Sequence, residues 1–141
     1  LGVIRSFRTD EGPHAGTIDL KTHGTRIFVD AARAFALGLG IPETNTVQRL
    51  RLASRRLNLE ERDAAALVDA FEYLQMLRLR VQRGGADAEG GAQVERPAAH
   101  PDPGRNRLDP YALNELDRRL LKEAFRQARS LQQLLERSLG Q

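Results

Sequence analysis

Residues 64–82, AAALVDAFEYLQMLRLRVQ, are the stretch of sequence that decides the fold. At 100° per residue, the apolar side chains form one stripe centred on Phe71, which predicts a helix packed into a core. The stripe then runs into Arg78 and Gln82, two polar side chains that both lie within about 20° of its centre. Because an unpaired buried charge costs several kcal/mol, Arg78 must have a buried partner or face a groove shared with another domain or ligand.

Amphipathic patterns on both sides of this stretch predict three further helices. Residues 25–39 are apolar on nearly every side, which indicates a central, largely buried helix with one polar stripe. Asn45 is expected to cap a second helix that runs to about Leu57, and Asn58 to introduce the third. The fourth begins near Asn114. Four helices joined mostly by short loops predict a mainly α, four-helix bundle-like domain.

The remaining segments lack a helical pattern. Residues 3–8 and 17–21 are expected to form two short strands, a small N-terminal β hairpin that must pack on the helices. Residues 84–107 are rich in Gly, Ala, Pro and charge without periodicity. This composition predicts that residues 84–107 form a flexible internal loop after the third helix. Asp109-Pro110 is then typical of the cap and first residue of a short turn.

The chain has 141 residues and no Cys. This length suits a single helical domain, residues 1–141, that buries roughly two-thirds of its unfolded surface. The absence of Cys excludes disulfides, zinc-thiolate sites and thiol nucleophiles, and favours a cytoplasmic location. No apolar stretch is long enough to span a membrane, and we expect no signal peptide. Because it begins at Leu1 instead of Met, we expect a C-terminal fragment of a longer protein.

The formal net charge is +3 and the isoelectric point is about 9.9. Such a balance suggests comparison with nucleic-acid-binding proteins. Acidic residues are nevertheless interleaved with the basic ones, as in residues 60–63 and 114–119. This alternation is typical of solvated helix faces, so nucleic acid is not the expected partner. It would become the expected partner only if the Arg side chains gathered on one face.

Residue types that serve catalysis or metal binding occur here without the required spacing. The histidines His14, His23 and His100 fall in expected turns or in the loop, and none belongs to a metal-ligand motif. The chain also lacks a Gly-Ser loop followed by an Asp-x-Asp pair, which would hold two metal ions for nucleotidyl transfer. We therefore expect no catalytic residue and no metal site in this chain alone.

A set of short motifs occurs in an order that resembles a known family. The motifs are Ile18-Asp19-Leu20-Lys21, Gly24, Val29-Asp30-Ala31-Ala32-Arg33, Gly40-Ile41-Pro42, Asn45-Thr46, Arg49-Leu50, Ala70-Phe71, Leu77-Arg78-Leu79-Arg80 with Gln82, Asn106 with Leu108-Asp109-Pro110, and Leu121-Lys122-Glu123-Ala124-Phe125. Together they resemble the putative nucleotidyltransferase substrate-binding domain. In bacterial proteins this module follows a catalytic domain similar to protein-PII uridylyltransferase. The sequence departs from the family pattern at Val81, where a His is expected, and in its longer loop.

The resemblance implies a helical bundle that orients an acceptor substrate beside a catalytic domain absent from this chain. The implied partners are that upstream nucleotidyltransferase domain of the same polypeptide and an acceptor, with a protein as one candidate. A homodimer is left open, and no membrane contact is expected. Mg²⁺ and a nucleoside triphosphate would belong to the missing catalytic domain, so this chain would need no cofactor.

Two other functions are alternatives to this one. Members of the family often carry cyclic-nucleotide-binding and CBS domains, so the resemblance also allows a regulatory or interaction bundle that docks those domains in signal transduction. The third function is a basic nucleic-acid-binding module, which the interleaved acidic residues disfavour.

Seven polar residues are candidates for a substrate-binding or inter-domain cleft: Asp30, Arg33, Asn45, Arg49, Arg78, Arg80 and Gln82. Several have plainer interpretations as well. Asp30 fits an exposed stripe of helical ion pairs with Arg26 and Arg33. An internal pair with Arg78 or Arg80 is the other interpretation of Asp30. Asn45 suits a helix cap, and Arg80 suits an exposed position because it lies opposite the Phe71 face.

The expectations for Arg78 and Gln82 are more specific. A structural network and an inter-domain cleft are both consistent with their place on the Phe71 stripe. For Arg78 we predict substantial burial and a hydrogen bond to a carboxylate, with Asp30 as the favoured partner and Asp19 as the alternative.

Overall fold

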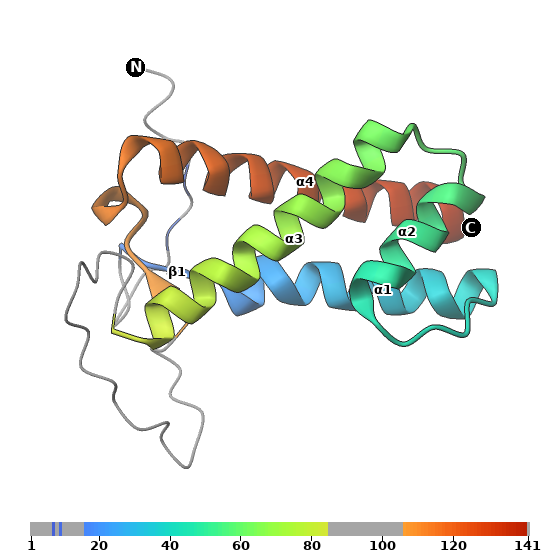
Figure 1. Cartoon of the computed structure of the whole chain (residues 1–141), viewed down its shortest axis with the longest axis horizontal. Coiled ribbons are helices and arrows are strands. Elements are labelled where there is room, and N and C mark those ends of the chain that lie inside the picture. The colour runs from blue at the N-terminus through green and yellow to red at the C-terminus, as the bar shows by residue number, and fades with distance from the viewer. Residues whose placement is uncertain (1–6, 8, 10–15, 85–105, 141) are drawn as a thin grey trace, which may run out of the picture.

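Helical spacing of apolar residues produces four helices that pack together, as the sequence predicts (Figure 1). The computed structural model describes Phe7, Thr9, residues 16–84 and residues 106–140. The helices of this part are α1 (Arg26–Leu39), α2 (Thr46–Arg56), α3 (Glu61–Gln82) and α4 (Glu115–Leu139). Strands β1 (Ile18–Asp19) and β2 (Arg107–Leu108) form a small antiparallel sheet. Short helices follow each strand, η3 (Lys21–Thr25) after β1 and η4 (Pro110–Ala112) after β2.

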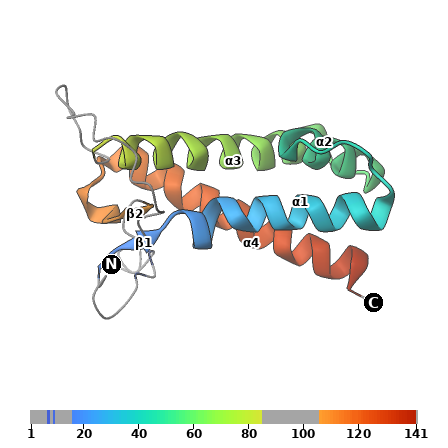
Figure 2. The ribbon, with the colours of Figure 1, turned by 90° about the horizontal axis from the view of Figure 1, so that it is seen from below.

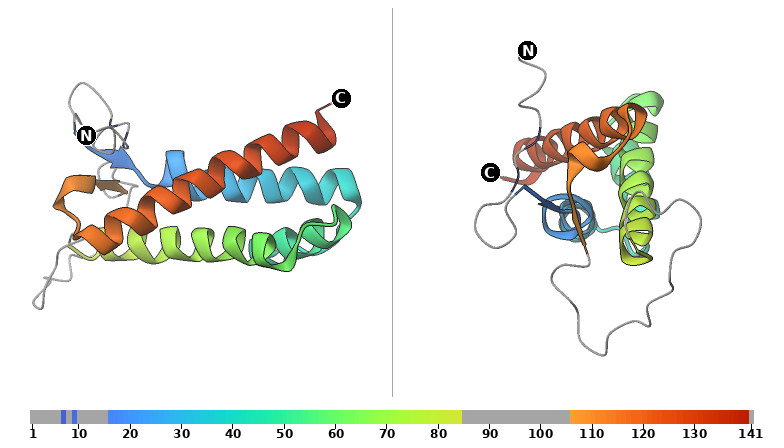
Figure 3. Two further views of the ribbon diagram at one scale, coloured as in Figure 1. Left: turned by 90° about the horizontal axis from the view of Figure 1, so that it is seen from above. Right: turned by 90° about the vertical axis from the view of Figure 1, so that its left-hand side faces the viewer.

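The long helices α1, α3 and α4 surround one apolar core. Seen along the bundle, they occupy the corners of a triangle, and α2 packs against α1 and α3 at the end away from the sheet (Figure 1 and Figure 3). The largest completely buried apolar side chains include Leu20, Phe28, Phe35, Leu50, Leu74, Leu77, Leu121 and Leu131. The rings of Phe28 and Phe71 meet with their centroids 5.8 Å apart. The Phe71 stripe is therefore the core face of α3.

Most helix ends follow the local signals of the sequence. The side chain of Asn45 accepts a hydrogen bond from the backbone N–H of Gln48 at 3.0 Å, and Asn114 accepts one from Asp117 at 2.7 Å. Both bonds satisfy N–H groups that a helix leaves without partners in its first turn. Gly40 ends α1 with φ at 68°, a left-handed conformation that favours glycine.

The expected helix cap at Asn58 is wrong. Helix α3 begins at Glu61, and its cap residue Glu60 makes no side-chain hydrogen bond to the helix. Asn58 instead has φ at 59°, a left-handed conformation that Asn tolerates better than most residues. Asn58 therefore turns the chain between α2 and α3.

The sheet lies at one end of the bundle and joins segments far apart in the sequence (Figure 2). Ile18 lies opposite Leu108 in its register. The strand predicted at residues 17–21 therefore has a partner that comes after α3, so the described pair is not a hairpin. Alternating polarity marks a half-buried strand but does not specify its partner. The other predicted strand, residues 3–8, lies outside the described residues except for Phe7.

Between β1 and α1 the chain forms the π-helix η3, which the sequence did not predict. The carboxylate of Asp19 starts it by accepting hydrogen bonds from the backbone N–H groups of Lys21 at 2.9 Å and Thr22 at 3.1 Å. A Cβ on Gly24 would come within 3.3 Å of Leu74 Cδ1, so the absent side chain lets η3 pack closely on α3. Short π-helical turns are frequent at functional sites.

The segment predicted as a flexible loop, residues 84–107, lies mostly outside the described residues. Asn106 and Arg107, its last two residues, are part of the structure, in the turn before β2 and in β2 itself. The short turn predicted after them is confirmed, because Asp109 accepts a hydrogen bond from the backbone N–H of Tyr111 at 2.9 Å.

Candidate functional site

A cavity of about 470 Å³ lies between η3, α1 and α3. Its lining consists of Lys21, Thr25, Arg26, Val29, Asp30, Arg33, Gln75 and Arg78. Helix α1 contributes residues three or four apart, which place their side chains on one face. The cavity therefore brings together Asp30, Arg33 and Arg78, three of the seven residues selected from the sequence. We call it the α1–α3 cavity.

Arg78 is half-buried in the wall of this cavity. Its Nε donates to Asn106 Oδ1 at 3.0 Å, and its Nη1 donates to Thr25 Oγ1 at 2.9 Å. Burial lowers the pKa of the guanidinium, and the charge of Asp19 opposes this shift. The predicted carboxylate hydrogen bond is wrong: within the described residues neither Asp30 nor Asp19 accepts a bond from Arg78. Two neutral oxygens accept the hydrogen bonds that the prediction assigned to a carboxylate.

Gln82 shares the acceptor that Arg78 uses. Its Nε2 donates to Asn106 Oδ1 at 2.9 Å, and the backbone oxygen of Asn106 accepts from the Leu20 N–H at 2.8 Å. The two polar side chains at the end of the Phe71 stripe thus belong to one structural network, as one of the two interpretations predicted. Arg78 also lines the cavity, whereas Gln82 positions Asn106.

The α1–α3 cavity concentrates the positive charge of the chain. Its lining, as far as the structure describes the chain, holds four of the 22 Lys and Arg residues and one of the 19 Asp and Glu residues. The rest of the sequence therefore carries 18 residues of each sign and no formal net charge. Arg26, Asp30 and Arg33 are exposed, as the solvent-stripe interpretation predicts. Within the described residues, however, no ion pair joins Asp30 to either arginine.

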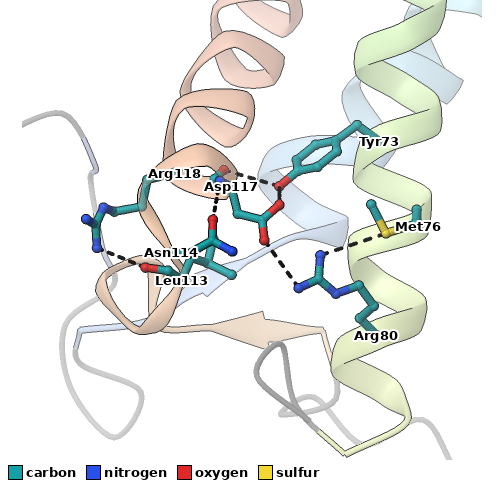
Figure 4. A network of polar contacts seen from close by, with 7 residues as sticks. All are labelled: Tyr73, Met76, Arg80, Leu113, Asn114, Asp117 and Arg118. Atoms are coloured by element: carbon teal, nitrogen blue, oxygen red, sulfur yellow. Dashed lines mark hydrogen bonds and ion pairs between the residues drawn. The ribbon is translucent and has the colours of Figure 1, made fainter. Parts of the chain in front are cut away.

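Arg80 points toward α4 and does not line the cavity (Figure 4). Its Nη2 lies 3.3 Å from Asp117 Oδ2, and Tyr73 donates its hydroxyl proton to Asp117 Oδ1 at 3.0 Å. Burial and this hydrogen bond raise the pKa of Tyr73. The side chain of Arg80 is 36% exposed and that of Asp117 is 13% exposed. Arg80 therefore fastens α3 to α4, which corrects its interpretation as a simple exposed side chain.

Asn45 and Arg49 lie at the start of α2 and do not line the cavity. Asn45 is the cap of α2, as its plainer interpretation predicts. Arg49 donates from Nε to the backbone oxygen of Glu43 at 2.7 Å, which fixes the turn before the helix. The seven residues selected from the sequence thus lie in three separate places.

A larger cavity of about 630 Å³ lies between α2 and α3. Its charged lining residues are Arg51, Arg55, Glu61 and Asp69, so the two signs balance. None of the seven residues selected from the sequence lines it. Since the α1–α3 cavity holds three of them and the net charge, it is the better candidate for a functional site.

Five residues of the cavity lining are not among the seven selected from the sequence: Lys21, Thr25, Arg26, Val29 and Gln75. The sequence pattern placed Lys21 at the end of a predicted strand and Thr25 at the start of a predicted helix, and no local pattern signalled that η3 would place both beside α3. Gln75 carried a usable signal, because it lies three residues before Arg78 and so on the same side of α3.

Two absences concern the described part of the chain. No helix there is both long and apolar enough to cross a membrane. In the same residues no three His, Asp or Glu side chains gather where they could hold a metal ion. The described lining of the cavity, with one carboxylate and four cations, does not fit a Mg²⁺ ion, which prefers several oxygen ligands.

The chain belongs to the putative nucleotidyltransferase substrate binding domain family, whose sequence model matches residues 1–139. This match confirms the resemblance inferred from the motifs. No curated protein and no solved structure matches the chain. The family description assigns the chain a substrate-binding role in a nucleotidyltransferase.

Proposed function

We propose that this chain orients the acceptor of a nucleotidyl transfer, and that the α1–α3 cavity forms part of the acceptor site. The observation that carries the proposal is the concentration of the net charge of the chain in one cavity. A family described as substrate binding needs a concave surface with convergent polar groups, and the α1–α3 cavity has both.

The catalytic domain of this proposal is a separate domain of the same polypeptide, similar to protein-PII uridylyltransferase. Mg²⁺ and the nucleoside triphosphate would bind to that domain. The contribution of this chain would be positioning, which can supply much of the rate enhancement when two reactants are held in the correct geometry.

The lining residues have distinct roles in the proposal. Arg33 and Arg78 would contact the acceptor, because one is exposed at the cavity and the other forms its wall. Asp30 would accept a hydrogen bond from the acceptor. Gln82 would act indirectly through Asn106, which it shares with Arg78. The proposal gives Asn45, Arg49 and Arg80 structural roles, since their described contacts stabilise the ends and the packing of the helices.

The test uses the full-length parent protein, labelled nucleoside triphosphates and cell extract as the source of acceptor. We expect deletion of residues 1–141 to reduce labelling of the acceptor to background. Arg33→Gln should reduce it roughly tenfold, because the acceptor would be held less precisely. The matched control is Arg129→Gln, which removes the same charge from an exposed position on α4 outside the cavity.

Undiminished labelling in the deletion variant would refute the substrate-binding role. That result would instead support a regulatory bundle that docks neighbouring cyclic-nucleotide-binding or CBS domains. An equal loss in Arg33→Gln and Arg129→Gln would show that general charge, and not the cavity, affects the reaction.

A further inference from the structure

The charge of the α1–α3 cavity indicates the chemical class of its ligand. We infer that the cavity binds a phosphate group of a small molecule through Lys21, Arg26, Arg33 and Arg78. The inference deepens the proposed function and rests on it for its biological role, since it specifies what the substrate must carry.

Charge complementarity favours phosphate over a single carboxylate. Among the described residues, four cations and one carboxylate line the cavity, which gives this lining a formal charge of three positive. A phosphate ester carries nearly two negative charges at neutral pH and three acceptor oxygens. A single carboxylate has one negative charge and can be satisfied by one bidentate arginine. Only the more highly charged ligand uses cations from η3, α1 and α3 together.

Arg78 supplies a second, independent reason. It is half-buried, yet within the described residues its hydrogen bonds go only to the neutral side chains of Thr25 and Asn106. Those bonds use Nε and Nη1, and no described side chain accepts from Nη2. A partly desolvated guanidinium without an anionic hydrogen-bond partner gains free energy when an anion enters the cavity. The bonds to Thr25 and Asn106 also hold the group in place beforehand.

Asp30 should affect phosphate binding in the opposite direction from the cations of the cavity. It is the only carboxylate in the described lining, and it is exposed. Its negative charge repels phosphate, so it must weaken binding of a simple phosphate ion. It can accept a hydrogen bond from a ligand hydroxyl. The combination suits a phosphate ester that also carries hydroxyl groups.

The size of the cavity agrees with such a ligand. A volume of about 470 Å³ is within the range of small-molecule sites and exceeds the needs of one phosphate ion. A nucleotide and a phosphorylated sugar share this chemistry. The experiment therefore includes both.

The experiment is isothermal titration calorimetry on the 141-residue chain without divalent cations. The probes are inorganic pyrophosphate, AMP, ribose 5-phosphate and, as a carboxylate of comparable charge, citrate. We expect the phosphate probes to bind. Raising the salt concentration to about 0.5 M should weaken their binding, because the cations of the cavity are largely exposed. Tighter binding of AMP would identify a nucleotide as the source of the phosphate, and tighter binding of ribose 5-phosphate would identify a phosphorylated acceptor.

The variants separate a built cavity from general attraction of anions. Arg33→Gln should weaken pyrophosphate binding roughly threefold to tenfold, and Asp30→Asn should strengthen it by a similar factor. Arg129→Gln, which makes the same change of charge on α4, should leave the affinity within about twofold. Circular dichroism shows whether each variant remains folded, which we expect because all three side chains are exposed.

Three results would overturn the inference: no binding of any phosphate probe, an equal effect of Arg33→Gln and Arg129→Gln, or citrate binding as tightly as pyrophosphate. Failure here is distinguishable from failure of the proposed function. A chain that binds no phosphate while its deletion abolishes labelling in the parent would keep the function and reject this ligand. Phosphate binding together with undiminished labelling in the deletion variant would keep this ligand and reject the proposed function.

Discussion

The Nε atom of Arg78 donates a hydrogen bond to the side-chain oxygen of Asn106 over 3.0 Å, which fastens the end of α3 to the residue before β2. Gln82 donates to the same oxygen, so two polar side chains at the end of the core stripe converge on one acceptor. Arg78 also donates to Thr25, the last residue of η3. One guanidinium thereby connects the sheet end of the bundle with the wall of the α1–α3 cavity.

Removing either partner of this bond should destabilise the domain. Arg78→Ala and Asn106→Ala are each expected to lower the free energy of unfolding by about 1.5 to 3 kcal/mol, the range for hydrogen bonds to a charged group. Loss of a buried ion pair would cost about 3 to 5 kcal/mol, but Asn106 is neutral. Urea denaturation of both single variants and the double variant measures these values.

The double variant should lose at least about 1 kcal/mol less than the sum of the single variants, because the two residues share an interaction. Arg33→Ala is the control, since an exposed substitution should change stability by no more than about 0.5 kcal/mol. Strictly additive losses would show that the bond between Arg78 and Asn106 contributes no stability.

The position of Arg78 could be predicted from the sequence, but its partner could not. Helical periodicity placed the residue on the core face, and burial of charge required a compensating group. Periodicity says nothing about contacts between distant segments. Asn106 comes at the end of a stretch without pattern, and the predicted partners of Arg78 were both carboxylates. A neutral amide that accepts two hydrogen bonds was therefore overlooked.

The same distinction between local and distant information explains the rest of the fold. The cap at Asn45 and the start of α4 near Asn114 could be predicted because each asparagine and its partner lie three residues apart. The pairing of β1 with β2 and the π-helix η3 depend on contacts across the bundle, such as that between Gly24 and Leu74. Of the cavity residues, Asp30 and Arg33 could be predicted from their shared helix face and Arg78 from its place on the Phe71 stripe, whereas the residues that η3 contributes could not.

Two asparagines near α2 should respond differently to substitution. Asn45→Ala is expected to lower the free energy of unfolding by about 1 kcal/mol, because the Gln48 N–H loses its acceptor. Asn58→Gly should be neutral within about 0.5 kcal/mol, because glycine adopts the left-handed conformation of residue 58 without strain. Thermal denaturation measures both. A large loss in Asn58→Gly would mean that its side chain, and not its backbone, stabilises the turn.

The contact between α3 and α4 should depend on the carboxylate of Asp117. Tyr73→Phe removes the hydroxyl that donates to the side chain and the backbone oxygen of Asp117, and should cost about 0.5 to 1.5 kcal/mol. Asp117→Ala should cost more, about 1.5 to 3 kcal/mol, because it removes the acceptor of Tyr73 and the counter-ion of Arg80. Chemical denaturation provides the values.

The exposed ion pair between Arg119 and Glu115 serves as the control for this contact. Arg119→Ala should change stability by no more than about 0.5 kcal/mol, since both side chains of the pair are largely in solvent. If Arg80→Ala had no greater effect than Arg119→Ala, the Arg80–Asp117 pair would be an ordinary surface pair.

Stability at acid pH should depend on Asp19, which starts the π-helix beside the cavity. Burial raises the pKa of its carboxyl group, but hydrogen bonds from Thr22 and Lys21 and the charge of Arg107 together lower the pKa below its ordinary value. A lowered pKa in the folded state means that Asp19 stabilises the domain above the unfolded pKa of about 3.9 and loses this contribution as the pH falls further.

Asp19→Asn keeps an acceptor for the backbone N–H groups but cannot titrate. The difference in free energy of unfolding between wild type and Asp19→Asn should therefore decrease as the pH falls below about 4, measured by urea denaturation. Thr22→Val removes one of the bonds that lower the pKa, so its stability should fall less steeply than that of wild type. Parallel curves for wild type and Asp19→Asn would show that Asp19 does not favour its charged form in the folded domain.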